Sequence, residues 1–231
     1  MKNKQWKNTL LLGFSGLLLW VTAFAQEKKE RLDNGWEITY SAQDRNLSGP
    51  YSITSGENVI MRGNFAADQP KGNWFAFSKS GDVAVRYNFD NNQVLKMDQD
   101  LITKATINIL SNDKKVKEGA RISFPLISTD YYIDYLKTLV KHTIPSHVKQ
   151  SDIKIPTEVT ATVDENGEVS YQAKYIAGNR EYQPKLKLKE DALRINWVPA
   201  EYNNKQYASE FTVYFELTLE DAPDHKRVIW N

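Results

Sequence analysis

Apolar and polar residues alternate along three segments of the C-terminal half of the chain. From 211 to 219 every second residue is apolar, and the residues between them are mostly polar. A period of two is typical of a strand, so this segment predicts a long strand with one buried face. The segments 159–163 and 169–175 alternate in the same way and flank Asn166-Gly167, which predicts a β-hairpin with a two-residue turn.

Helical spacing of apolar residues occurs in two other segments. Between Ile133 and Val140 the apolar residues recur three and four positions apart, Thr129 is a candidate N-cap, and Pro145 ends the pattern. A helix is therefore predicted from Thr129 to a point before Pro145. Residues 185–195 predict a second helix, which begins directly after Pro184.

Short apolar alternations separated by glycine and Asn/Asp clusters fill residues 35–95, which is typical of strands and turns. The tripeptide Gly49-Pro50-Tyr51 recurs as Gly72-Asn73-Trp74, and Arg62-Gly63-Asn64-Phe65 recurs as Arg86-Tyr87-Asn88-Phe89. A turn glycine, Gly56 or Gly81, lies inside each copy. The pattern predicts two copies of a strand–turn–strand unit.

This part of the chain resembles the MORN-variant repeat family, whose unit contains a glycine, two aromatic residues, a turn glycine and a closing aromatic residue. The residues that match are Gly72, Trp74, Phe77, Gly81 and Tyr87. The resemblance implies a β-meander whose aromatic side chains form its core, because repeat units bury one another's faces. The alternative is an aromatic face of Tyr51, Trp74 and Phe77 that binds a glycan or peptidoglycan.

The connecting segment 96–127 has weaker patterns. Residues 105–110 and 121–127 predict strands, and Asn112-Asp113-Lys114-Lys115 predicts a turn between them. The charge run at 114–118 is interpreted as part of a solvated turn.

Composition limits the possible functions. The chain has 231 residues, of which 41% are hydrophobic and 26% are charged, as in ordinary globular proteins. Lys and Arg number 30 and Asp and Glu number 29, so no large basic field is available to attract nucleic acid. The absence of cysteine excludes disulfides, thiolate metal sites and the lipoprotein route.

The N-terminus has the layout of a secretory signal peptide. Lys2, Lys4 and Lys7 precede an apolar stretch that ends at Ala23-Phe24-Ala25, a small-residue cleavage pattern. Cleavage after Ala25 is predicted, which places the mature protein in the periplasm or outside the cell without a stable membrane span. An uncleaved membrane anchor is the alternative.

The C-terminal part resembles the C-terminal domain of TonB-type energy transducers, because several separated motifs occur in the order of that family. They are Ile144-Pro145, Val163-Asp164, Gly167, Val169, Trp197-Val198-Pro199-Ala200 and Val213-Tyr214-Phe215. Gly167, Trp197, Pro199 and Phe215 are markers of the fold rather than groups with chemistry. The match extends over about 131–219.

The resemblance implies binding of a segment of an envelope protein, whose strand adds to an open sheet edge. In this chain the edge would be the strand 211–219, with Thr212, Tyr214 and Glu216 selecting the partner. Transducers keep an N-terminal membrane helix and a long Pro-rich spacer, whereas this chain has a cleavable leader and eight scattered prolines. Energy transduction is therefore not expected.

Together these observations predict an α+β protein. It consists of a signal peptide (1–25), a charged and solvated lead-in (26–34), a β-rich repeat module with connecting strands (35–128), a transducer-like domain (129–220) and a polar tail (221–231). The transducer-like domain is expected to have βαβ-hairpin topology with an antiparallel sheet.

The sequence favours a protein without enzymatic activity. His142 and His147 flank Pro145 and cannot share a helix face, and no nucleotide, zinc-protease or nucleophile-elbow motif occurs. No metal and no cofactor are expected. The enzymatic alternative is a hydrolase with a carboxylate pair, and we expect no cleft to bring two acids within about 5–10 Å.

Overall fold

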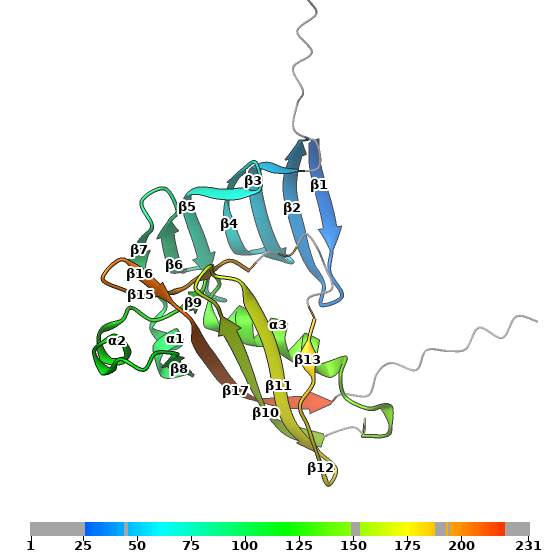
Figure 1. Cartoon of the computed structure of the whole chain (residues 1–231). Helices are drawn as coiled ribbons and strands as arrows, with labels where there is room; N and C mark the ends of the chain where they lie inside the picture. The colour runs from blue at the N-terminus through cyan, green and yellow to red at the C-terminus, as the bar shows by residue number, and fades with distance from the viewer. Residues whose placement is uncertain (1–25, 44–45, 149–152, 188–192, 194, 220–231) are drawn as a thin grey trace, which may run out of the picture.

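The computed structural model describes residues 26–43, 46–148, 153–187, 193 and 195–219. The predicted signal peptide and polar tail lie outside these residues and stay predictions. The N-terminal part forms one antiparallel sheet in which each strand pairs with the next along the chain (Figure 1). Its strands are β1 (Gln26–Arg31), β2 (Trp36–Gln43), β3 (Asn46–Ser55), β4 (Asn58–Ala66), β5 (Gln69–Phe77), β6 (Val83–Asn88) and β7 (Gln93–Lys96).

The two predicted strand–turn–strand units are confirmed as hairpins of this meander. The first copy is the hairpin β3–β4 and the second is β5–β6. Gly56 and Gly81 lie in the two turns with φ angles of +59° and +86°, a left-handed conformation that glycine adopts at no steric cost.

The charged lead-in is a correction to the sequence analysis. Residues 27–31 are exposed, as predicted, but they belong to strand β1, which pairs with β2 along its whole length, and Leu32 is buried in the core. Cross-strand partners explain how so polar a segment becomes a strand: Lys29 lies 3.4 Å from Glu37, and Tyr40 donates a hydrogen bond to Glu30. An edge strand with both faces in water needs no apolar residue.

The inward face of the meander is aromatic, and its closest contact depends on Gly63. A Cβ atom at this position would lie 2.2 Å from the indole ring of Trp74. Trp74 therefore lies flat across β4, where its Nε1 donates to the carbonyl of Asn64 at 3.2 Å. The rings of Tyr51 and Phe65 pack around it with centroid separations of 5.7 and 5.0 Å.

A second antiparallel sheet follows, with the order β12-β11-β10-β17-β8, and β13 also pairs with β11. The strand and hairpin predictions for 159–175 and 210–219 are confirmed. The strands are β8 (Ala105–Ile109), β10 (Ile153–Val163), β11 (Val169–Ala177), β12 (Arg180–Tyr182), β13 (Lys185–Leu186) and β17 (Ser209–Leu219). Because β8 belongs to this sheet, the sheet includes a segment that precedes residue 129.

The predicted helix is confirmed as α3 (Thr129–Lys141), and it lies between the two sheets (Figure 1). Ser128 rather than Thr129 occupies the N-cap position. Tyr131 and Tyr135 contact Trp36 of the meander, whereas Tyr132 contacts the second sheet. Both sheets and the helix therefore share one continuous hydrophobic core.

The second predicted helix is wrong where the structure describes it. Lys185 and Leu186 form β13, and Leu193 and Ile195 lie in no helix; most of the residues between them are outside the described ranges. Leu186 is buried opposite Tyr171 of β11, a position that it reaches because its backbone is extended and pairs with β11. Apolar spacing alone does not separate a buried extended segment from a helix.

The connecting segment 96–127 also differs from its prediction. Two short helices form, α1 (Gln99–Thr103) and α2 (Lys114–Gly119), the second of which replaces the predicted solvated turn. Asp113 caps α2 by accepting from the backbone of Lys115 at 2.8 Å. Of the predicted strand at 121–127, only β9 (Phe124–Pro125) forms, and it pairs with β14 (Trp197–Val198). The remaining hairpin is β15 (Ala200–Tyr202) with β16 (Lys205–Tyr207).

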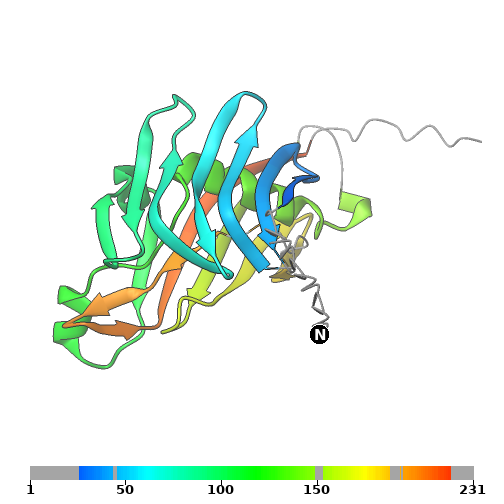
Figure 2. The ribbon, with the colours of Figure 1, turned by 90° about the horizontal axis from the view of Figure 1, so that it is seen from above.

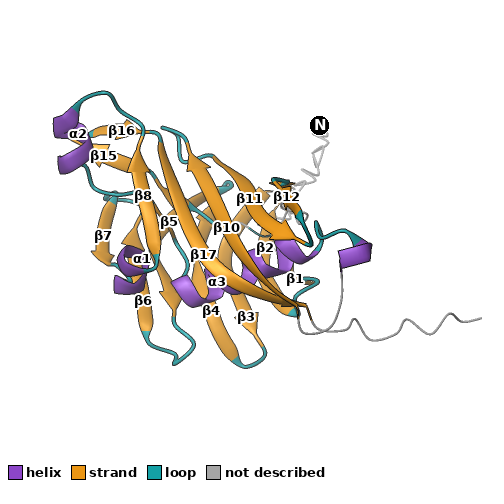
Figure 3. Ribbon diagram, turned by 90° about the horizontal axis from the view of Figure 1, so that it is seen from below, coloured by secondary structure: helices purple, strands orange, loops and turns teal. Residues whose placement is uncertain are grey.

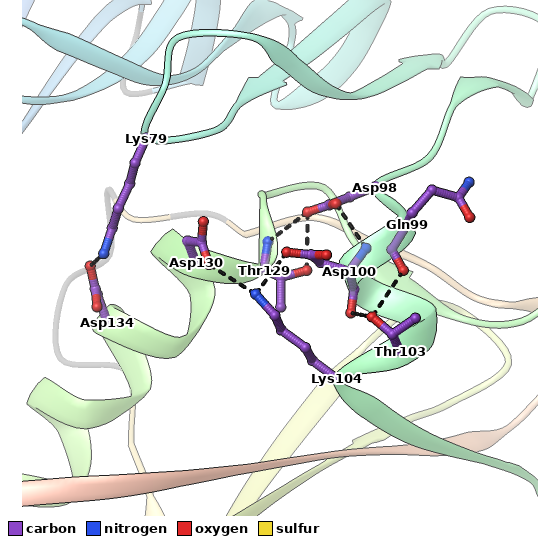
Figure 4. A network of polar contacts seen from close by, with 9 residues as sticks. All are labelled: Lys79, Asp98, Gln99, Asp100, Thr103, Lys104, Thr129, Asp130 and Asp134. Atoms are coloured by element: carbon purple, nitrogen blue, oxygen red, sulfur yellow. Dashed lines mark hydrogen bonds and ion pairs between the residues drawn. The ribbon is translucent and has the colours of Figure 1, made fainter.

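Polar contacts hold the start of α3 in place (Figure 4). Asp98 accepts from the backbone of Asp100 at 3.0 Å, which caps α1, and from the backbone and hydroxyl groups of Thr129 at 3.1 and 3.0 Å. Lys79, in the loop after β5, forms an ion pair of 2.7 Å with Asp134 of α3. This ion pair raises the pKa of Lys79, against the lowering effect of burial. The carboxylate of Asp98 thus stabilises the starts of both α1 and α3, and the ion pair of Lys79 links the meander to α3.

Candidate functional site

The solvent-facing side of the second sheet contains a groove of about 460 Å³ across β11, β10 and β17. Its volume is within the range of ordinary ligand sites. Six outward side chains line it: Pro156, Glu158, Lys174, Ile176, Tyr214 and Glu216. We refer to it as the β17 groove.

The register of the sheet brings these side chains together. Glu158 of β10 lies opposite both Lys174 of β11 and Tyr214 of β17, and Pro156 lies opposite Glu216. Residues directly opposite each other in an antiparallel sheet share a face and touch. Two rows of side chains therefore define the groove, and each of the three strands contributes one charged and one uncharged side chain to it.

Two large apolar side chains in the groove are more than half exposed. Ile176 is 59% exposed and Tyr214 is 57% exposed, the highest values among the large hydrophobic residues that the structure describes. Lys154 forms an ion pair of 3.0 Å with Glu216, and Lys174 lies 3.8 Å from Glu181. The groove therefore offers exposed apolar area for contact. Its rim contains side chains of both charges, some of which form ion pairs.

The second feature of the site is the edge of β17. Strand β8 pairs only with Ser209–Val213, whereas β10 pairs with β17 along its whole length (Figure 3). From Tyr214 to Leu219, no described strand lies on the side opposite β10. We call this segment the free edge; alternate backbone N–H and C=O groups along it point away from β10.

The predicted edge strand is thus only half correct. Thr212 lies between Thr160 of β10 and Thr106 of β8, and its hydroxyl is 2.9 Å from that of Thr160. It is not at an edge, because β8 covers the first half of β17. Tyr214 and Glu216 do lie on the free edge, and both line the β17 groove.

Three of the four residues predicted as fold markers, Gly167, Trp197 and Pro199, lie close together, where the turn between β10 and β11 meets residues 197–199. Trp197 donates from Nε1 to the hydroxyl of Tyr171 at 2.9 Å, and its ring packs against Phe211 with centroids 5.3 Å apart. A Cβ at Gly167 would lie 3.2 Å from the carbonyl oxygen of Trp197 and 3.8 Å from Pro199. The structure brings these three markers together.

Phe215, the fourth marker, lies apart from the other three. Its half-buried ring is 5.9 Å from the ammonium group of Lys137 on α3.

The predicted two-residue turn at Asn166-Gly167 is wider than expected. β10 ends at Val163 and β11 begins at Val169, and of the two turn residues only Gly167 has a positive φ angle, +82°. Asp164 accounts for the difference, because its carboxylate accepts from the backbone of Asn166 and Glu168, both at 2.8 Å. The side chain thereby stabilises a longer loop.

Burial around Trp197 raises the pKa of two tyrosines. Tyr132 of α3 and Tyr171 of β11 are almost completely buried against this ring, and burial is the main cause in both cases. The hydrogen bond donated by Trp197 acts in the opposite direction on Tyr171, but it is the smaller effect. Both hydroxyl groups are protonated in the folded protein at neutral pH.

The alternative aromatic face is contradicted. Tyr51 and Trp74 are each 1% exposed and belong to the core under the meander. Phe77 lies opposite them on the outward face, where the guanidinium of Arg62 is 5.3 Å from its ring. The three rings cannot contact one ligand, because adjacent positions of a strand point to opposite faces.

The sequence analysis missed Ile176, Lys174, Glu158 and Pro156. A signal for the first of these was present: in the segment 169–177 the inward positions are odd-numbered, so Ile176 is an apolar residue at an outward position. The other three are found only through the pairing register.

The groove also contains two acids, Glu158 and Glu216. They are diagonal neighbours on adjacent strands, a relationship that places the Cα atoms about 7–8 Å apart. Glu216 already has Lys154 as an ion-pair partner in an exposed position. Within the described ranges, no three His, Cys, Asp or Glu side chains are grouped to hold a metal ion.

Comparisons with protein-family models, curated protein sequences and solved structures gave no match. Both family resemblances therefore stay predictions that rest on the quoted motifs. Among the described helices, none has the length and apolar character needed to cross a membrane.

Proposed function

We propose that the protein is an exported, non-enzymatic interaction module that binds an extended segment of a cell-envelope protein at the free edge of β17. The observation that carries this proposal is the start of β8 at Ala105, opposite Val213, which leaves Tyr214–Leu219 paired on one side only in the described part of the sheet. A partner segment in extended conformation would pair with this part of β17, on the same side on which β8 pairs with Ser209–Val213. It would supply the backbone hydrogen bonds that this half of β17 lacks.

The β17 groove supplies selectivity beside this backbone contact. Every second side chain of an added strand would face the same side as Tyr214 and Glu216. Apolar partner residues would cover Tyr214, which is already more than half exposed. Glu158 and Lys174 present opposite charges on the far side of Tyr214, so polar partner residues can also be matched.

A photo-crosslinking amino acid at position 214 tests this proposal in cells that make the protein. Position 172 is the matched control, because Gln172 is outward and exposed but has neighbours on both sides, Thr160 and Lys185. We expect position 214 to capture one segment of an envelope protein that position 172 does not capture. Equal capture at both positions would count against the free edge.

A synthetic peptide with the captured sequence then tests the mode of binding. We expect it to slow amide hydrogen exchange in Tyr214–Leu219, because the added strand accepts hydrogen bonds from the alternate amides of this segment that point away from β10. Substitution of Tyr214 by lysine, a residue that protects natural sheet edges, is expected to weaken peptide binding about tenfold. If the peptide binds without slowing exchange in this segment, strand addition is wrong.

A further inference from the structure

The outward face of the meander has a surface that the proposed function does not use. Directly opposed residues on successive strands share this face, and one row of them crosses all seven strands. The row consists of Lys29, Thr39, Ser52, Arg62, Phe75, Arg86 and Lys96. Figure 2 views the meander from this side and shows no described element over its strands. We call the part formed by Arg62, Phe75 and Arg86 the arginine face.

The two arginines of this face lie on either side of one aromatic ring. The guanidinium of Arg62 is 5.5 Å from the centroid of Phe75, and that of Arg86 is 5.3 Å from it. Both arginines are exposed, and neither forms an ion pair within the described part of the chain. Stacking on a ring orients a guanidinium group and leaves its N–H groups available. Two of these N–H groups can donate parallel hydrogen bonds to the two oxygens of a carboxylate.

A groove of about 330 Å³ continues from Arg62 toward β2. Hydroxyl and amide side chains dominate its lining: Thr39, Ser41, Ser52, Asn64 and Asn73. These groups donate and accept hydrogen bonds, as the hydroxyl groups of a sugar require. The single acid, Glu27, lies at the β1 end, away from the arginines.

We propose that the arginine face and this groove bind a polysaccharide that carries carboxylate groups. Arg62 and Arg86 lie two strands apart, a separation of about 9–10 Å at the usual strand spacing, so they suit charges repeated along a chain better than one compact anion. Phe75 between them is only half-buried, which leaves part of its ring for a sugar face.

The same surface is poorly suited to a lipid bilayer or an apolar peptide. Of the large hydrophobic side chains that the structure shows as exposed, only Leu95 lies on the meander, at its far edge strand β7. Membrane-binding surfaces need apolar area in addition to positive charge.

The internal repeat explains how the arrangement arises. Arg62 and Arg86 occupy the same position in the two copies of the strand–turn–strand unit, so duplication places two equivalent arginines on one face. This equivalence is independent of the β17 groove, which belongs to the other sheet.

Polygalacturonate, a carboxylated polysaccharide, is the probe for the test, with neutral dextran and phosphatidylglycerol vesicles as comparison ligands. Binding is measured by calorimetry or by retardation in a gel that contains the polymer. The double variant Arg62→Gln/Arg86→Gln removes the arginine face. The matched control, Lys115→Gln/Lys117→Gln, removes the same charge from the exposed helix α2.

We expect the full chain to bind polygalacturonate more tightly than dextran or vesicles. Each arginine removed is expected to weaken binding about tenfold, because each loses a charge-assisted hydrogen-bonded contact. The control variant is expected to bind like the wild type, and Arg62→Lys/Arg86→Lys to recover only part of the affinity, since an ammonium group does not present this parallel pair of N–H donors. The circular dichroism spectrum of each variant verifies that it is folded.

Three outcomes would overturn the proposal: no binding of polygalacturonate, equal weakening by the control variant, or tighter binding to the vesicles. None of them bears on the free edge of β17, because the two experiments use different surfaces and different probes.

Discussion

The indole ring of Trp36 lies stacked on the phenol ring of Tyr135, with centroids 5.7 Å apart and planes at 28°. Trp36 begins strand β2 of the meander, and Tyr135 lies in the middle of helix α3. Tyr131 packs edge-on against the same indole, with centroids 6.0 Å apart. This aromatic contact joins the N-terminal sheet to the helix that also supports the second sheet.

Replacement of Trp36 by alanine is expected to lower the free energy of unfolding by about 3–5 kcal/mol, as for other large buried aromatic side chains. Urea denaturation monitored by fluorescence and by far-UV circular dichroism measures the loss. Since the two sheets share one core, we expect both probes to show one transition in the wild type. Two separate wild-type transitions would mean that the sheets unfold independently.

Gly63→Ala is expected to be destabilising because of one neighbour, the ring of Trp74. The added Cβ would overlap that ring, and overpacking of this kind costs about 1–3 kcal/mol. In a Trp74→Ala background the same substitution is expected to cost little. A double-mutant cycle measures the difference, and a cost that is unchanged in that background would show that another contact is responsible.

Stability is expected to fall steeply in alkaline solution. The folded-state pKa values of Tyr132 and Tyr171 are raised by burial, so above about pH 10 the unfolded chain loses protons that the folded protein keeps. The stabilisation is complete below the unfolded pKa and is lost as the pH rises toward the folded values.

These two groups together contribute about 2.7 kcal/mol per pH unit to the slope above pH 10. Tyr171→Phe is expected to remove the contribution of one group, about 1.4 kcal/mol per pH unit, from the measured slope, which urea titrations at several alkaline pH values would determine. An unchanged slope in this variant would show that Tyr171 titrates equally in both states.

Asp98→Ala is expected to cost about 2–3 kcal/mol. The substitution removes the cap of α1 and leaves the backbone N–H of the buried Thr129 without its acceptor. Asp113→Ala, which removes a similar cap from the exposed helix α2, is the control and is expected to cost about 1 kcal/mol. Equal thermal shifts in the two variants would contradict a specific role for Asp98 at the start of α3.

Local patterns predicted many of the elements correctly. Alternation predicted β17 and the β10–β11 hairpin, helical spacing predicted α3, and the internal repeat predicted two hairpins of the meander. Each of these depends on a period within one segment, so the residues of that segment suffice. The prediction failed at Lys185–Leu186, where an apolar residue is buried by a neighbouring strand rather than by its own helix.

The candidate site could be predicted only in part. Tyr214 and Glu216 follow from the alternation along β17, because outward positions on a half-buried strand are the ones that meet a partner. Ile176 and Glu158 come from other strands, and only the pairing register places them beside Tyr214. The burial of Tyr51 and Trp74 likewise depends on which face of the meander meets α3.

The sequence by itself determined where the chain alternates, turns and repeats, because these properties are set by residues a few positions apart. Only the tertiary structure decided that β8 covers Thr212 and stops before Tyr214, and that α3 is buried on both sides. The physical reason is that pairing between distant strands and packing between layers depend on the whole set of buried contacts. No single segment contains that information.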